Sequence, residues 1–124
     1  MSDGASFYWN ELMTSDVEAA KAFYKETLGW EFQGMPMESG DTYWMVPGDP
    51  MPVCGMFDVA GTPFADMGEQ WVAYIAVDDI DARVAKARAA GATIVQEPMD
   101  VPEVGRIAML TQPGGGFIGW MTPS

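Results

Sequence analysis

The stretch FYWNELMTSDVEAAKAFYKETLGWE, residues 7–31, is matched in plan by QWVAYIAVDDIDARVAKARAAGAT, residues 70–93. Each copy reads as a strand, an Asp, a helix of about a dozen residues with an apolar stripe, a Gly and another extended run. Aligning Asp16 with Asp79 brings the glycines that end the two helices to within one residue of register. An offset of about half the chain indicates a duplicated module and not a solenoid repeat.

Capping and turn residues divide the first copy into elements. Ser15 and Glu18 have the spacing of a capping box, Asp16 adds negative charge to the first helical turn, and Gly29 ends the helix. The first module is therefore predicted to cover about 7–59, with strands at about 7–13, 30–36, 42–47 and 53–59.

The second copy follows a linker expected at residues 60–69 and is predicted to cover about 70–121. Its elements are a strand, a helix and three further strands, expected at about 70–77, 79–90, 92–96, 105–111 and 116–121. Residues 97–105 contain two prolines, and proline cannot donate a hydrogen bond to a strand ladder. This segment is therefore predicted to be a loop.

Each module thus reads as βαβββ, and the two together predict a single α+β domain over residues 1–124. The expected architecture is two βαβββ modules that form a curved mixed sheet around a groove, with the helices outside. Similar half-domains tend to pack about a pseudo-twofold axis, so the groove between them is the expected place for a site.

Composition restricts the compartment and the partners. A chain of 124 residues suits one domain, and its 18 acidic and 6 basic residues give a net charge of −12. Such a surface repels nucleic acid and anionic lipid, so neither is an expected partner. No apolar run reaches the length of a membrane span, and the segment MSDGAS lacks the features of a signal peptide. With Cys54 as its one cysteine, the chain is predicted to be cytoplasmic.

A series of short motifs runs along nearly the whole chain. In order they are Asp16, Ala22-Phe23-Tyr24, Leu28-Gly29-Trp30, Val77-Asp78-Asp79, Gly91, Gly105-Arg106 and Pro113-Gly114-Gly115-Gly116-Phe117. This series resembles the vicinal oxygen chelate superfamily, which includes glyoxalase I, extradiol dioxygenases, and bleomycin- and fosfomycin-resistance proteins. The last strand, Phe117-Ile118-Gly119-Trp120, is similar to that of a compact glyoxalase-like branch. The resemblance implies a homodimer, which exposed sheet edges also favour.

The resemblance also implies a divalent metal held by the first and last strands of each module, with His, Gln or Glu as the usual ligands. The corresponding positions in this chain are Trp9, Val72, Gly119 and the segment Cys54–Met56. None of these is a usual ligand, and the chain has no histidine. We therefore expect no metal and no other cofactor. The alternative is a non-standard site made by Glu11, Asp58 and Cys54.

Strand alternation assigns a face to each candidate ligand-binding residue. In residues 70–77 the positions Trp71, Ala73, Ile75 and Val77 are expected to pack on the helices, and the intervening residues to face the groove. The candidates for ligand contact are then Trp9, Glu11, Met13, Val72, Tyr74, Phe117 and Gly119. Each of them can instead serve packing alone, and Gly119 in particular can make room for a bulky neighbour across the sheet.

Arg106 is a further candidate, because it is the one basic residue outside the predicted helices. It could clamp a ligand carboxylate, or form an ion pair with Glu11, Glu103 or another acid. Cys54 has no predicted base beside it and reads as a small buried residue.

The residues and the resemblance favour a small-molecule-binding protein without a catalytic metal. It would hold an apolar or aromatic ligand, neutral or cationic, with Trp9 for stacking and Glu11 for charge neutralisation. The alternative is a lyase or dioxygenase with an atypical metal site, or an enzyme that uses Glu11 as a general base. A third interpretation is a purely structural or dimer-partner role.

Overall fold

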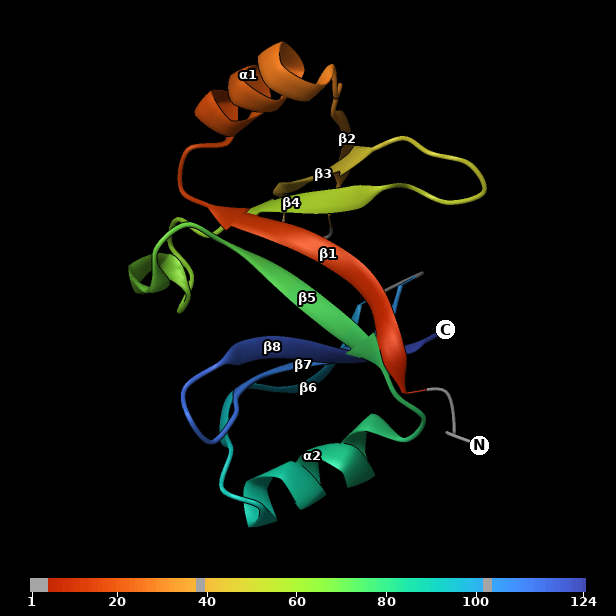
Figure 1. Ribbon diagram of the computed structural model, residues 1–124, viewed down its shortest axis with the longest axis vertical. Coiled ribbons are helices and arrows are strands. Elements are labelled where there is room, and N and C mark those ends of the chain that lie inside the picture. Colours follow the sequence, from red (N-terminus) through yellow and green to blue (C-terminus); the bar gives the residue numbers. More distant parts are fainter. Residues whose placement is uncertain (1–4, 38–39, 102–103) are drawn as a thin grey trace. The chain divides into compact units, whose positions relative to one another are not determined.

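The computed structural model describes residues 5–37, 40–101 and 104–124, and it has the predicted α+β class (Figure 1). Within these residues lie two α-helices, one 3-10 helix and eight strands. In chain order they are β1 (Ser6–Thr14), α1 (Val17–Leu28), β2 (Gln33–Pro36), β3 (Thr42–Val46), β4 (Cys54–Asp58), η1 (Ala65–Met67), β5 (Gln70–Ala76), α2 (Ile80–Ala89), β6 (Thr93–Val101), β7 (Gly105–Thr111) and β8 (Phe117–Pro123). Neither α-helix in the described ranges is long and apolar enough to cross a membrane.

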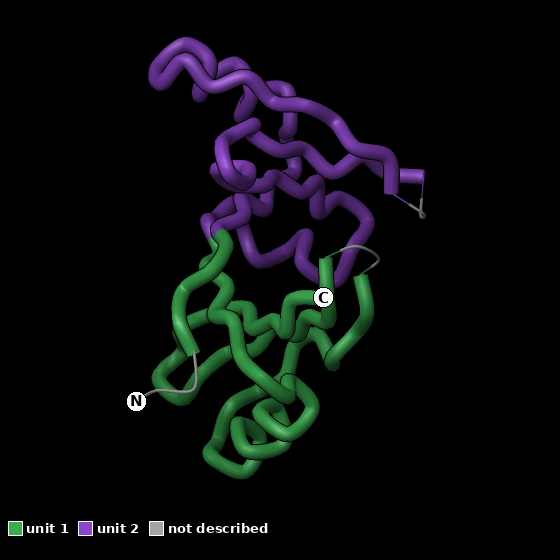
Figure 2. The backbone as a smooth tube through the Cα atoms, turned by 90° about the vertical axis from the view of Figure 1, so that its right-hand side faces the viewer, with its two compact units in different colours: residues 1–9, 72–124 green, residues 10–71 purple. Residues whose placement is uncertain are grey.

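The chain divides into two compact units (Figure 2). Unit 1 comprises residues 1–9 and 72–124, and unit 2 comprises residues 10–71. Residues 60–69, where the sequence predicts a linker, belong to unit 2 and contain η1. The boundaries fall inside β1 and β5. Unit 1 therefore includes the first residues of β1, and unit 2 includes the first two residues of β5.

In unit 2, four strands run in the order β2-β3-β4-β1, and α1 covers one face of their sheet. β1 is parallel to β4, while β4 and β3, and β3 and β2, are antiparallel. Leu12, Ala20 and Met56 are buried between sheet and helix, with Trp44 and Tyr24 packed against them. The apolar stripe predicted for the helix packs on the sheet through Val17, Ala20 and Tyr24, whereas Leu28 at its end is exposed.

In unit 1, four strands run in the equivalent order, β6-β7-β8-β5, and α2 covers one face. β5 is parallel to β8, while β8 and β7, and β7 and β6, are antiparallel. The core is Val77, Ile80, Val84 and Ala108, with Ile75, Ile94 and Trp120 packed against it. Both units therefore have the same pairing plan, as the duplicated βαβββ pattern predicts.

The helix starts differ from the prediction by one residue. Asp16, and not Ser15, is the N-cap of α1: its carboxylate accepts a hydrogen bond from the Ala19 amide at 3.0 Å. Asp79 caps α2 in the same way through the Ala82 amide, at 3.2 Å. Aspartate is as good a cap as serine, so the spacing of Ser15 and Glu18 was a weak guide to the boundary.

The loop predicted at residues 97–105 is wrong for most of its length, because β6 continues to Val101. Pro98 is tolerated because β6 is the last strand in the order and pairs with β7 alone. Its pairing also shifts register between Ile94 and Gln96 and again between Gln96 and Met99. An edge strand with such irregularities accommodates a proline that a central strand would reject.

Candidate functional site

The candidate site of unit 2 lies on the sheet face opposite α1. Leu12 in β1 and Met56 in β4 both pack towards α1. Alternation then turns their neighbours Glu11 and Met13 to the other face, as predicted from the sequence. Both are buried, with 7% and 1% of their surface exposed. Trp9, two positions earlier in β1, is half-buried and belongs to unit 1, so it is described apart from the site of unit 2.

Glu11 is held by a tyrosine that the sequence interpretation did not single out. The Tyr43 hydroxyl, from β3, donates a hydrogen bond of 2.7 Å to Glu11 Oε1. Burial of a carboxylate is costly unless the oxygens are hydrogen-bonded, and a bond to a charged acceptor is among the stronger ones. The pair thus places a fixed, buried carboxyl group on a sheet face that also carries Met13.

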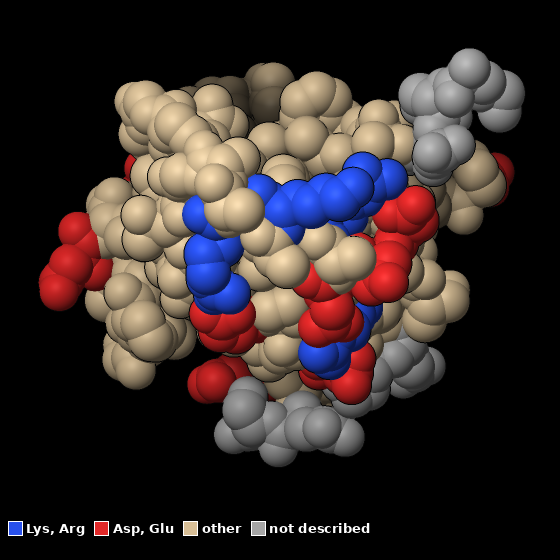
Figure 3. All heavy atoms as spheres, turned by 90° about the horizontal axis from the view of Figure 1, so that it is seen from below, with Lys and Arg blue, Asp and Glu red and all other residues tan. Residues whose placement is uncertain are grey.

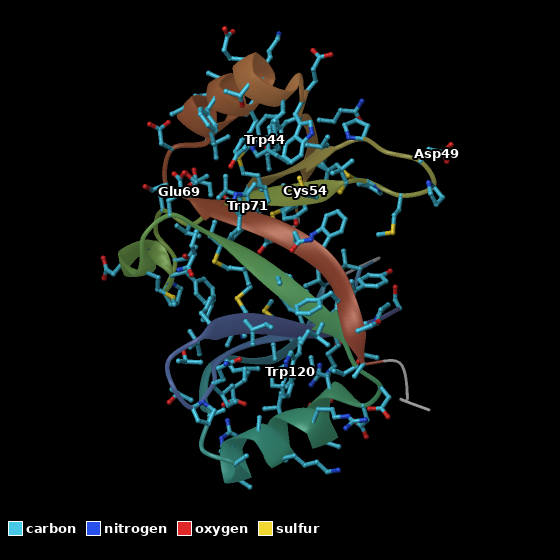
Figure 4. The ribbon with its side chains drawn as sticks, in the orientation of Figure 1. Trp44, Asp49, Cys54, Glu69, Trp71 and Trp120 are labelled. Atoms are coloured by element: carbon cyan, nitrogen blue, oxygen red, sulfur yellow. The ribbon has the colours of Figure 1, made fainter. Side chains whose placement is uncertain are left out.

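A glycine makes this contact possible. Gly55 in β4 is the register partner of Glu11 in β1 and of Met45 in β3. A Cβ built on Gly55 would collide with the Tyr43 hydroxyl and ring. The tyrosine therefore reaches across β4 only because the residue beneath it has no side chain. Trp44, the next residue of β3, lies on the α1 side of the sheet (Figure 4), so alternation turns Tyr43 to the other face. This alternation was the sequence signal that could have identified Tyr43.

Unit 1 has a related arrangement on the sheet face opposite α2. Ile75 and Trp120 pack on the α2 side, so Val72, Tyr74 and Gly119 lie on the other face. Val72 and Tyr74 are buried, at 1% and 3% exposed. Tyr74 and Gly119 are register partners, and a Cβ on Gly119 would lie 2.5 Å from the Tyr74 ring. Gly119 does make room for a bulky neighbour across the sheet.

The remaining candidates of the last strand and its neighbour are placed differently. Phe117 is half-buried in β8 and shares the strand face of Gly119, two positions on. Arg106 in β7 is turned towards α2. Its guanidinium donates to Asp81 at 2.9 and 3.0 Å and to Asp100 at 3.2 Å. Of the two alternatives for Arg106, the structure shows the ion pair, with Asp81 and Asp100 as partners in place of Glu11. Glu103, the other acid named from the sequence, lies outside the described residues.

Basic and acidic side chains alternate over the α2 side of unit 1 (Figure 3). Besides the Arg106 pairs, Arg83 pairs with Asp78 at 2.8 Å, and Arg88 pairs with Glu97. The hydrogen bond from Arg106 lowers the pKa of Asp81, and the bonds to Asp81 and Asp100 raise the pKa of Arg106 further. These are surface pairs, and each contributes little to stability.

At three of the positions where the resemblance implies metal ligands, the structure places an aliphatic side chain or a glycine. Val72 is a buried aliphatic residue, and the two last-strand glycines, Gly55 and Gly119, have tyrosine rings in the space where a ligand side chain would begin. The alternative donors also diverge: Cys54 and Asp58 share the α1 face with Met56, while Glu11 points to the other face. Among the residues described, no three His, Cys, Asp or Glu side chains gather to hold a metal ion.

Cys54 is buried, as expected for a small core residue. Burial raises the pKa of its thiol to about 11, because a thiolate loses hydration in an apolar environment. The thiol is therefore protonated at neutral pH, and a protonated buried thiol is a poor nucleophile.

Comparison with known proteins agrees with this architecture. Residues 7–118 match the family model described as Glyoxalase/Bleomycin resistance protein/Dioxygenase superfamily. The provisionally named glyoxylase CFP32 of Mycobacterium tuberculosis is 34% identical over 124 residues, which is 100% of this chain and 46% of that protein. The anthracycline biosynthesis protein DauV of Streptomyces sp. is 32% identical over 114 residues, 88% of this chain and 38% of that protein.

The chain therefore spans less than half the length of the curated relatives it matches. Among solved structures, methylmalonyl-CoA epimerase of Streptomyces coelicolor aligns with a TM-score of 0.66 at 20% identity. That alignment covers 97% of this chain and 98% of the epimerase chain. At this identity the likeness concerns the fold alone.

Proposed function

Because this chain belongs to the Glyoxalase/Bleomycin resistance protein/Dioxygenase superfamily, we propose that it is a small-molecule-binding protein whose ligand lies against the sheet face of Glu11. The ligand is apolar or aromatic, and neutral or cationic. The observation that supports this most is the Glu11–Tyr43 hydrogen bond of 2.7 Å, buried beside Met13. Apolar surroundings with one precisely placed polar group are typical of small-molecule sites.

Each group has a defined part in this proposal. Met13 offers an adaptable apolar contact beside Glu11, while Trp9, which belongs to unit 1, stays the sequence-based prediction for stacking. Glu11 orients the ligand and neutralises a positive charge, while Tyr43 fixes the position of the carboxylate. We propose that no divalent metal takes part, since the positions at which the resemblance implies metal ligands hold Trp9, Val72, Gly119 and the segment Cys54–Met56.

The test uses proflavine, a planar aromatic cation, and anthracene as its neutral counterpart. We expect Glu11→Gln to weaken proflavine binding about tenfold, the size of one hydrogen bond to a charged group, and anthracene binding much less. Gln keeps an oxygen that can accept from Tyr43, so the fold is preserved. Fluorescence titration measures both ligands, with Glu26→Gln on exposed α1 as the matched control.

Three results would contradict the proposal. Proflavine affinity could be the same in the wild type and Glu11→Gln, or it could fall equally in Glu26→Gln. Elemental analysis of the purified protein could also find a stoichiometric divalent metal, which would contradict metal-free binding.

An enzyme with Glu11 as general base is a second candidate, and the same hydrogen bond favours it. In this candidate the buried Glu11 carboxylate, which Tyr43 holds through a hydrogen bond of 2.7 Å, removes a proton from a bound carbon acid. The resemblance to a provisionally named glyoxylase makes small carbonyl compounds the first substrates to assay. Turnover that survives a chelator and disappears in Glu11→Gln supports this candidate, and loss of turnover with chelator alone opposes it.

A further inference from the structure

A cleft on the α1 side of unit 2 lies apart from the Glu11 face. It has a volume of about 160 Å³ and is lined by Lys21, Lys25, Trp30, Glu31 and Phe32. A cavity of about 150 Å³ accommodates benzene, so this cleft has room for one aromatic ring. Because Lys21 projects from α1 over Trp44, which packs on the helix side of the sheet, the cleft and Glu11 lie on opposite faces.

The aromatic wall of the cleft is fixed by its neighbours. Trp30 stacks on Tyr24 with ring centroids 5.3 Å apart, and Phe32 meets it edge to face at 6.3 Å. Trp71 also packs edge to face on Trp30, and its indole N–H donates to the Tyr24 hydroxyl at 3.0 Å. An indole held by several contacts loses little freedom when a ring stacks on it, which favours binding.

The charged rim of the cleft combines two ammonium groups with one carboxylate. Lys21 and Lys25 are four residues apart on α1 and therefore project to the same side. Lys21 lies 3.9 Å from the Trp44 ring centroid and 3.4 Å from the exposed Glu18 carboxylate. Lys25 and Glu31 are both exposed and 4.0 Å apart, a spacing at which an ion pair is weak and easily exchanged.

We propose that this cleft binds a small aromatic carboxylate. The ring lies against Trp30 and Phe32, and the carboxylate takes the place of Glu31 beside Lys25, with Lys21 as the second cation. Glu31 competes with the ligand for Lys25, so its charge opposes binding. The proposal is independent of the function proposed above, because it uses other residues on another face of the sheet.

Benzoate is the probe, and benzyl alcohol is its neutral counterpart. Titration followed by the indole N–H resonance of Trp30 should show benzoate bound more tightly than benzyl alcohol. The double variant Lys21→Gln/Lys25→Gln should weaken benzoate binding about threefold or more, and Glu31→Gln should strengthen it by a similar factor. Lys86→Gln on α2 is the matched control and should change nothing. Added salt should weaken benzoate alone.

The outcomes separate the two proposals. Glu11→Gln should leave benzoate binding unchanged, and Glu31→Gln should leave proflavine binding unchanged. Equal affinity for benzoate and benzyl alcohol, or a benzoate affinity that ignores both the lysine variants and Glu31→Gln, would overturn the assignment. Lys25 and Glu31 are exposed and Lys21 is partly exposed, and circular dichroism of each variant checks that the fold is kept.

Discussion

The two units use the same strand plan but place different chemistry at the same position. Glu11 in β1 and Tyr74 in β5 are each in register with a glycine of the unit's last strand, Gly55 and Gly119. In unit 1 the tyrosine at this position fills the space over its own glycine. In unit 2 the position is a carboxylate, and a tyrosine from a different strand, Tyr43, crosses the glycine to bind it.

The difference separates a packing feature that both units share from a polar pair that stands at this position in unit 2. In both units a glycine leaves the space that a tyrosine ring occupies, so this contact is part of the scaffold. At the compared position unit 2 has the carboxylate of Glu11, whereas unit 1 has Tyr74. The variants below either disturb the glycine–tyrosine contact that both units share or remove the Glu11–Tyr43 hydrogen bond that distinguishes unit 2.

The largest effect is expected from adding a methyl group beneath either tyrosine. Gly119→Ala puts a Cβ 2.5 Å from the buried Tyr74 ring, and Gly55→Ala puts one against Tyr43. Each should lower the free energy of unfolding by about 3 kcal/mol, the upper part of the overpacking range. Urea denaturation measures both variants.

A double-mutant cycle is the control for this prediction. Tyr74→Ala combined with Gly119→Ala should cost less than the sum of the single changes, because the added methyl group then has space. If the losses in unfolding free energy of the two single variants simply add, the Tyr74 ring does not need the space above Gly119. That result would contradict the proposed contact.

An intermediate effect is expected when the distinguishing hydrogen bond is removed. Tyr43→Phe leaves the ring over Gly55 but takes away the donor to Glu11. A buried carboxylate without that donor should cost about 1.5–3 kcal/mol of stability, read from the urea midpoint. The exposed Tyr8→Phe is the control and should change stability by less than about 0.5 kcal/mol. Combining Tyr43→Phe with Glu11→Gln should recover part of the lost stability. A Tyr43→Phe variant as stable as Tyr8→Phe would show that Glu11 does not need the hydrogen bond from Tyr43.

Much of the scaffold follows from local rules in the sequence. Alternation placed Glu11 and Ile75 on the correct faces, because both lie in strands with one face packed on a helix. It failed at Pro98, where tolerance depends on the strand order, and no local pattern reveals which strand is at an edge. Tyr43 was missed for a similar reason: its partner is 32 residues away, and the contact requires a glycine on the strand between them. The groove between the modules and the homodimer stay predictions.

The smallest effect concerns a pair found in unit 1. The hydrogen bond from Arg106 holds the pKa of Asp81 below its ordinary value of 3.8. A carboxyl whose pKa is lower in the folded state contributes stability above the unfolded pKa, and loses it as the pH falls through the folded value. Arg106→Gln should therefore destabilise the protein slightly at pH 7, and the difference from the wild type should shrink below about pH 4. Asp81→Asn should behave in the same way in urea denaturation at both pH values, and the double variant should add little. A difference between wild type and Arg106→Gln that stays constant from pH 7 to pH 2.5 would mean that Arg106 acts through packing of its side chain and not through the Asp81 charge.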